Sequence, residues 1–125
     1  LTQCKKENNS NDLTTGIVGN YTNAAEATNI VVNKVDNSTV SITLVTGTGS
    51  GKYDVGFPNV TMNSASSFTL NAVTQDGGTC IGIETFSGTG TTSNNNISLF
   101  ITVTGTETGT PYDCSNWTDN VSATK

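Results

Sequence analysis

The stretch ISLFITV at residues 97–103 decides the fold, because apolar side chains occupy every second position in it. Successive side chains of an extended chain point to opposite faces, so one face of this stretch is apolar. That face consists of Ile97, Leu99, Ile101 and Val103. The stretch TVSITLV at residues 39–45 repeats the alternation, and its apolar face consists of Val40, Ile42 and Leu44. Both stretches therefore predict strands with one buried face.

Further short runs bring the number of predicted strands to about eight. Two of them alternate clearly, with apolar faces formed by Tyr53, Val55 and Phe57 and by Phe68, Leu70 and Ala72. The other runs lie at residues 30–35, 60–62, 81–86 and 117–123. We expect Pro58 to end a strand or to lie on a sheet edge, because proline has no amide hydrogen for a strand ladder. One turn of helix is expected in the stretch NAAEAT at residues 23–28.

Short turn sequences separate these runs, and they favour one topology. Asp36-Asn37, Asp76-Gly77-Gly78 and Asn94-Asn95-Asn96 suit the backbone conformations of tight hairpins. Strands joined in this way predict an all-β, antiparallel up-and-down meander that closes into a barrel of about eight strands. A two-sheet β-sandwich is the alternative. We expect residues 1–12 to form a flexible tether and residues 13–125 to form the barrel domain.

The composition excludes several classes of function. Charged residues make up 12% of the chain, the net charge is −5, and the sequence contains neither Arg nor His. An acidic chain without Arg is a poor nucleic-acid binder. Without His, and without a base–nucleophile pair, catalysis is not expected. The ten acidic residues form no calcium-loop pattern, so we expect no cofactor and no metal. Glu84, Asp113 and Asp119 are interpreted as scattered surface acids, with a meeting near Cys80 and Cys114 as the alternative.

The three cysteines divide into a pair and a single residue. Cys80 and Cys114 lie at the edges of predicted strands in the folded body, whereas Cys4 lies in the tether. A bond between Cys80 and Cys114 closes a loop of about 35 residues, which stabilises the fold by up to about 4 kcal/mol on the chain-entropy model. We therefore predict this disulfide, with two buried free thiols as the alternative.

The sequence around Cys4 is similar to the start of a bacterial lipoprotein. Leu1-Thr-Gln-Cys4 resembles the end of a lipoprotein signal, and Cys4-Lys-Lys-Glu7 resembles the first residues of surface lipoproteins of Bacteroidetes-type bacteria. This resemblance implies an exported protein that is held at the outer membrane, on the cell surface, by a lipid on Cys4. An ordinary thiol at this position is the alternative.

Two stretches of the body resemble short lipocalin-like lipoproteins of the same bacteria. Ile17-Val-Gly-Asn-Tyr21 is similar to the opening of lipocalin-like domains. Phe86-Ser-Gly-Thr-Gly-Thr91, followed by the strand at 97–103, is similar to a hairpin of these proteins. The resemblance implies a lipocalin-like barrel and a surface location, and it implies no particular substrate.

Two functions from different classes remain. The first is a non-catalytic surface lipoprotein that acts as an accessory or interaction subunit, with protein partners in an outer-membrane assembly. Its recognition residues would lie on rim loops at residues 47–51 and 104–112, and the bulky predicted core faces favour this alternative. The second is a binding module that carries a small apolar or sugar-like ligand in the barrel mouth. The expected contact residues are Tyr53, Phe57, Phe68, Tyr112 and Trp117.

Overall fold

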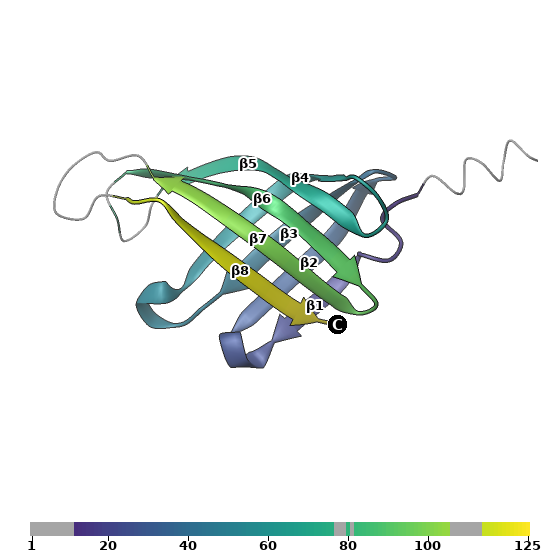
Figure 1. The fold of residues 1–125 in the computed structure, drawn as a ribbon, viewed down its shortest axis with the longest axis horizontal. Coiled ribbons are helices and arrows are strands. Elements are labelled where there is room, and N and C mark those ends of the chain that lie inside the picture. Colours follow the sequence, from purple (N-terminus) through teal and green to yellow (C-terminus); the bar gives the residue numbers. More distant parts are fainter. Residues whose placement is uncertain (1–11, 77–79, 81, 106–113) are drawn as a thin grey trace, which may run out of the picture.

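The computed structural model describes residues 12–76, 80, 82–105 and 114–125, which form a closed barrel of antiparallel strands in chain order (Figure 1). The strands are β1 (Gly19–Asn23), β2 (Thr28–Asp36), β3 (Thr39–Thr46), β4 (Tyr53–Met62), β5 (Ser67–Asp76), β6 (Ile83–Ser93), β7 (Asn96–Gly105) and β8 (Trp117–Thr124). Two 3-10 turns, η1 (Ala24–Glu26) and η2 (Gly49–Gly51), precede β2 and β4. The up-and-down barrel is confirmed, and the sandwich alternative is excluded.

The interior of the barrel is built from the faces that the alternation predicts. The inward apolar residues of β3 and β7 are at most 2% exposed. They pack in one core cluster with Tyr21, Phe57, Phe68 and Phe86. The packing is close: a Cβ atom built on Gly90 of β6 would overlap Cζ of Phe68. Phe68 therefore occupies the space that a side chain at position 90 would need.

The prediction that Ala72 belongs to the core face of β5 is wrong, because a bulge interrupts the alternation. Leu70 pairs with Gly88 and Val73 pairs with Phe86, so Asn71 and Ala72 together face the single residue Ser87. An extra residue in one strand moves all later side chains to the opposite face. Ala72 is exposed as a result, and Val73 packs against the core in its place.

Pro58 lies within β4 and does not end it. It belongs to a second bulge, where Val40 pairs with Val60 but Ile42 pairs with Phe57. The ladder between β4 and β5 covers only the three pairs from Val60–Leu70 to Met62–Phe68, so the part of β4 that contains Pro58 has an open side. Pro58 therefore lies at a local edge of the sheet, which is one of the two positions expected from the sequence. Side-chain amides of Asn71 and Gln75 donate 2.8 Å hydrogen bonds to the carbonyl oxygens of Asn59 and Asp54 across this gap.

The two ends of the barrel differ. We call the end with the β2–β3, β4–β5 and β6–β7 hairpins the closed end, because residues 12–18 pack there, at the right of Figure 1. Thr14 and Ile17 are buried, the Tyr21 hydroxyl donates to the Ile17 carbonyl oxygen at 2.7 Å, and the Leu13 amide donates to the Asn37 carbonyl oxygen at 2.7 Å. We call the opposite end, with η1, η2 and the β5–β6 and β7–β8 connections, the loop end.

Candidate functional site at the loop end of the barrel

Three aromatic rings meet inside the barrel near its loop end. They are Tyr53 at the start of β4, Phe86 in β6 and Trp117 at the start of β8. The ring centroids of Tyr53 and Trp117 are 5.0 Å apart in an edge-to-face arrangement. Phe86 lies 5.9 Å from Tyr53 and 6.0 Å from Trp117. These separations are typical of favourable aromatic pairs, so the rings form one packed cluster.

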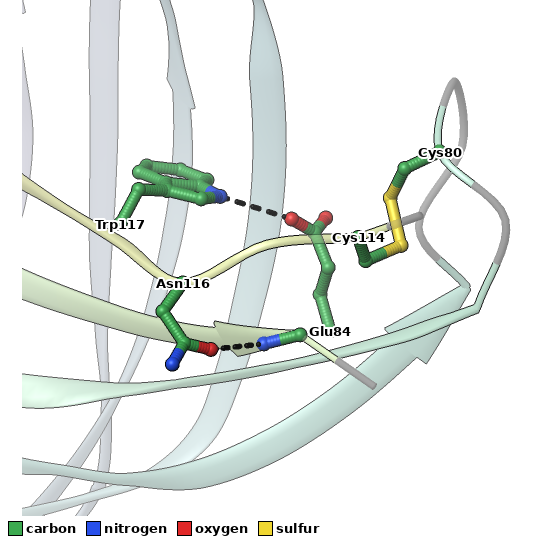
Figure 2. Close-up of a disulfide and its surroundings, with 6 residues drawn as sticks. Cys80, Glu84, Cys114, Asn116 and Trp117 are labelled. Carbon is green, nitrogen blue, oxygen red and sulfur yellow. Dashed lines mark hydrogen bonds between the residues drawn. A yellow bond between two sulfur atoms is a disulfide. The ribbon is translucent and has the colours of Figure 1, made fainter. Parts of the chain in front are cut away.

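Each polar ring of this cluster donates a hydrogen bond to a carboxylate. The Tyr53 hydroxyl donates to Oδ2 of Asp119 at 2.8 Å, and the indole Nε1 of Trp117 donates to Oε2 of Glu84 at 3.0 Å. Figure 2 shows the Glu84 carboxylate pointing toward the indole ring. We call Tyr53, Glu84, Phe86, Trp117 and Asp119 the mouth cluster. The interpretation of Glu84 and Asp119 as scattered surface acids is therefore wrong.

Burial and the neighbouring carboxylate set the protonation of Tyr53. Burial in the aromatic cluster raises the pKa of the Tyr53 phenol far above its usual value of 10.0, and the hydrogen bond and negative charge of Asp119 raise it further. Tyr53 is therefore a neutral hydrogen-bond donor across the physiological pH range.

The predicted disulfide between Cys80 and Cys114 is confirmed. It joins the β5–β6 connection to the β7–β8 connection, with a Cα–Cα distance of 4.9 Å. The end of β7 lies close to this bridge, because a Cβ atom built on Gly105 would come within 2.6 Å of the Cys114 carbonyl group. The Gly105 amide donates to Oδ1 of Asn116 at 2.9 Å (Figure 2). Glycine at position 105 thus permits the close approach beside the disulfide.

The other two connections of the loop end are also joined to each other. The Gly47 amide donates to the Glu26 carbonyl oxygen at 3.1 Å. The hydroxyl groups of Thr28 and Thr46, both buried, are 2.6 Å apart. Among the described residues, no buried side-chain nitrogen or oxygen lacks a hydrogen-bond partner. The β1–β2 and β3–β4 connections are therefore joined, and the buried polar side chains of the described part of the loop end have hydrogen-bond partners within the protein.

The structure separates the five predicted ligand-contact residues. Tyr53 and Trp117 meet in the mouth cluster. Phe57 and Phe68 are each 1% exposed and belong to the packed core. Tyr112 lies outside the described residues, as do Cys4, Asp113 and residues 106–112 of the second predicted rim loop.

Sequence reasoning did not place Phe86, Glu84 and Asp119 at the barrel mouth, although the sequence holds the necessary signal. Glu84 precedes Phe86 by two positions, and Asp119 follows Trp117 by two. The period of two along a strand puts each carboxylate on the same inward face as its aromatic neighbour. Acidic residues at inward positions of predicted strands were therefore the sequence signal for these site residues.

Other kinds of site are not formed by the described residues. In that part of the chain, no three His, Cys, Asp or Glu side chains gather in a way that could hold a metal ion. It also contains no helix with the length and apolar character needed to cross a bilayer. No family model, curated protein or solved structure matches this chain. The fold and the mouth cluster therefore carry the functional argument.

Proposed function

We propose that the protein is a non-catalytic recognition module of a bacterial cell surface, which is attached through a lipid on Cys4 and binds a protein partner through the loop end of its barrel. One observation carries this proposal: residues 12–18 pack at the closed end, whereas the disulfide and the mouth cluster lie at the loop end. Attachment through the N-terminal side would therefore hold the closed end toward the membrane and present the loop end outward.

The bracing of the loop end supports recognition on its rim. The disulfide joins one pair of connections, and the Gly47–Glu26 hydrogen bond joins the other pair. Loops that are fixed before binding lose less conformational entropy when a partner docks. The core residues and the satisfied polar groups favour a packed interior. Recognition by exposed loops on a rigid scaffold is the arrangement that these features support best.

Site-specific photo-crosslinking in the source bacterium tests this proposal. A photoreactive amino acid is placed at Thr48, which is exposed beside η2 at the loop end. The matched control carries it at Asn37, which is exposed in the β2–β3 hairpin at the closed end. We expect a discrete adduct with an outer-membrane protein from position 48 and none from position 37. The same adducts from both positions, or none from position 48, would overturn the proposal.

The attachment is tested separately, by metabolic labelling with palmitate. We expect label in the membrane fraction of cells that express the wild-type chain with its native signal. Cys4→Ala should abolish labelling and release the protein from membranes. An unlabelled wild-type chain would remove the lipid from the proposal without affecting the crosslinking result.

A small-ligand site in the mouth is the second candidate, favoured by the two carboxylates that lie among aromatic rings. Tyr53 and Trp117 each use one carboxylate oxygen of their partner, and the second oxygen could accept from a ligand hydroxyl or amine. Trp117 is the single Trp of the chain, so its fluorescence reports on this site alone. A saturable change in emission with decanol or a monosaccharide, weakened by Glu84→Gln, is the expected sign of such a ligand. No change at millimolar concentrations would exclude these ligands.

A further inference from the structure

A hollow lies on the outer face of the barrel, away from the mouth cluster. It is an open groove of about 470 Å³ over the start of β5 and over β6, β7 and β8, and these last three strands lie at the front of Figure 1. This volume is within the range of small-molecule sites in proteins. A second hollow, of about 680 Å³, adjoins it over the start of β7, the end of β8 and the end of β1. Ser98 and Ser122 line both hollows, so the two form one track across the sheet.

The outward residues of three strands form a regular array along the groove. Phe100 of β7 pairs with Thr89 of β6 on one side and with Asn120 of β8 on the other. The next outward row consists of Thr91, Ser98 and Ser122, which pair in the same way. Paired residues of neighbouring strands share a face and lie within contact distance. The array therefore surrounds the Phe100 ring with hydroxyl and amide groups.

The chemistry of this surface is uniform. Among the described residues, every polar side chain that lines the two hollows is an Asn, Ser or Thr, and none that lines them is charged. Phe100 is 44% exposed, and it is the one exposed aromatic side chain among the residues that the structure describes. Hydroxyl and amide groups both donate and accept hydrogen bonds, whereas no group here can pair with an ionic ligand.

We propose that this groove binds a neutral oligosaccharide or polysaccharide. The Phe100 ring stacks on the apolar face of one sugar ring. Around it, Thr89, Asn120 and the Thr91–Ser98–Ser122 row exchange hydrogen bonds with the sugar hydroxyls. The adjoining hollow extends the track for further residues of the same glycan. This site is distinct from the rim and from the mouth cluster, so it does not depend on the function proposed above.

Two other classes of occupant fit the groove less well. A charged ligand would find no oppositely charged side chain among the described lining residues. A protein interface usually has an apolar core with several aromatic or aliphatic anchors, and this face offers Phe100 alone among large exposed apolar residues. The other exposed large apolar residues, Val18, Val35 and Ile83, line neither hollow.

Amide chemical-shift mapping with defined neutral glycans tests the proposal. The ¹⁵N-labelled protein is titrated with maltohexaose, cellohexaose, xylohexaose, mannohexaose and galactan oligosaccharides at up to millimolar concentrations. We expect at least one of them to shift the amides of Ser98, Phe100 and Asn120. Phe100→Ala should weaken that binding at least tenfold. Val35→Ala, which removes an exposed apolar side chain of β2 outside the groove, should leave it unchanged.

The same titrations separate this site from the mouth. Binding on the outer face should leave the emission of Trp117 unchanged, since the indole lies inside the barrel against Tyr53 and Phe86. Shifts centred on Trp117 and Tyr53 would overturn the outer-face proposal in favour of the mouth. No response to any of the neutral glycans, or equal loss of binding in Phe100→Ala and Val35→Ala, would also overturn it. The spectrum of Phe100→Ala without glycan verifies that the variant is folded.

Discussion

The Tyr53 hydroxyl and the Asp119 carboxylate are joined by a 2.8 Å hydrogen bond across the inside of the barrel. Tyr53 belongs to β4 and Asp119 to β8, two strands that are not neighbours in the sheet. The bond therefore connects opposite parts of the wall without any backbone pairing. The Trp117–Glu84 hydrogen bond connects β8 to β6 at the same end. Together they hold the loop end in shape from within.

Asp119→Asn should lower the pKa of Tyr53 without returning it to 10.0, because burial is the larger cause of the raised pKa and remains in the variant. Because the pKa of Tyr53 is raised in the folded state, the contribution of Tyr53 to stability is complete below pH 10 and is lost as the pH rises above 10. Absorbance titration of the phenols measures this pKa, and Tyr53→Phe identifies the transition that belongs to Tyr53. The same Tyr53→Phe variant should lower the free energy of unfolding by about 1–3 kcal/mol. Identical titrations of wild type and Asp119→Asn would contradict this account.

The strands were predictable because period-two alternation depends on local sequence alone. ISLFITV has no interruption between Ile97 and Val103, and its predicted inward face is the observed one. The bulge at Asn71–Ala72 was not predictable in this way. It depends on how β5 aligns with β6, where Leu70 pairs with Gly88 and Gly90 leaves room for Phe68. Register between strands is a tertiary property, so sequence alternation alone placed Ala72 on the wrong face.

The candidate site was predictable only in part, for a similar reason. Tyr53 and Trp117 were expected as aromatic contact residues at the barrel mouth, together with Phe57, Phe68 and Tyr112. The meeting of Tyr53 and Trp117 with Glu84 and Asp119 depends on the barrel closing, which brings β4, β6 and β8 around one space. The disulfide could be predicted from cysteine number and position, and a place for Glu84 near it was the alternative interpretation of the acidic residues, but the partners of Glu84 and Asp119 could not be predicted.

Replacing both Cys80 and Cys114 with Ser should lower the free energy of unfolding by about 2–4 kcal/mol, because the bridge restricts the unfolded chain over a sequence separation of 34 residues. Denaturant unfolding of the oxidised wild type and the double variant measures this difference. Reduced wild type should match the variant, which serves as the control. Peptide mapping without reductant should recover the two cysteines as one linked pair, and recovery of two free thiols would contradict the bridge.

Gly90→Ala should lower the free energy of unfolding by about 1–3 kcal/mol, because its Cβ would overlap the Phe68 ring. By itself, Phe68→Leu should lower the free energy of unfolding. In the Gly90→Ala background the same substitution should lower it by less, because the smaller side chain leaves space for the added Cβ. Gly56→Ala is the matched control, because a Cβ atom built at this position of β4 meets nothing within 4 Å. Thermal or denaturant unfolding of the four variants tests the packing. Equal costs at positions 56 and 90 would contradict it.

Asp12 should titrate at about pH 2, well below its usual pKa of 3.8. The first cause is the hydrogen bond from Lys34, whose Nζ lies 2.7 Å from Oδ2, and the hydroxyl and amide of Thr14 donate to Oδ1 as well. Because the folded pKa is the lower one, the contribution to stability is complete above about pH 4 and is lost as the pH falls through 2. Carboxyl NMR titration measures the pKa. Hydrogen exchange at Leu13 and Ile17 reports whether residues 12–18 leave the closed end at low pH.

Lys34→Gln supplies the decisive comparison for Asp12. It should raise the pKa of Asp12 toward 3.8 without reaching it, because the two hydrogen bonds from Thr14 remain. Asp36 is the internal control in the same spectra. The pKa of Asp36 is lowered chiefly by the Ser38 amide, which donates to the Asp36 carboxylate at 2.9 Å. Lys34→Gln should therefore leave the pKa of Asp36 unchanged. A wild-type Asp12 that titrates at 3.8, or equal shifts of Asp12 and Asp36 in the variant, would show that Lys34 does not hold residues 12–18 at the closed end.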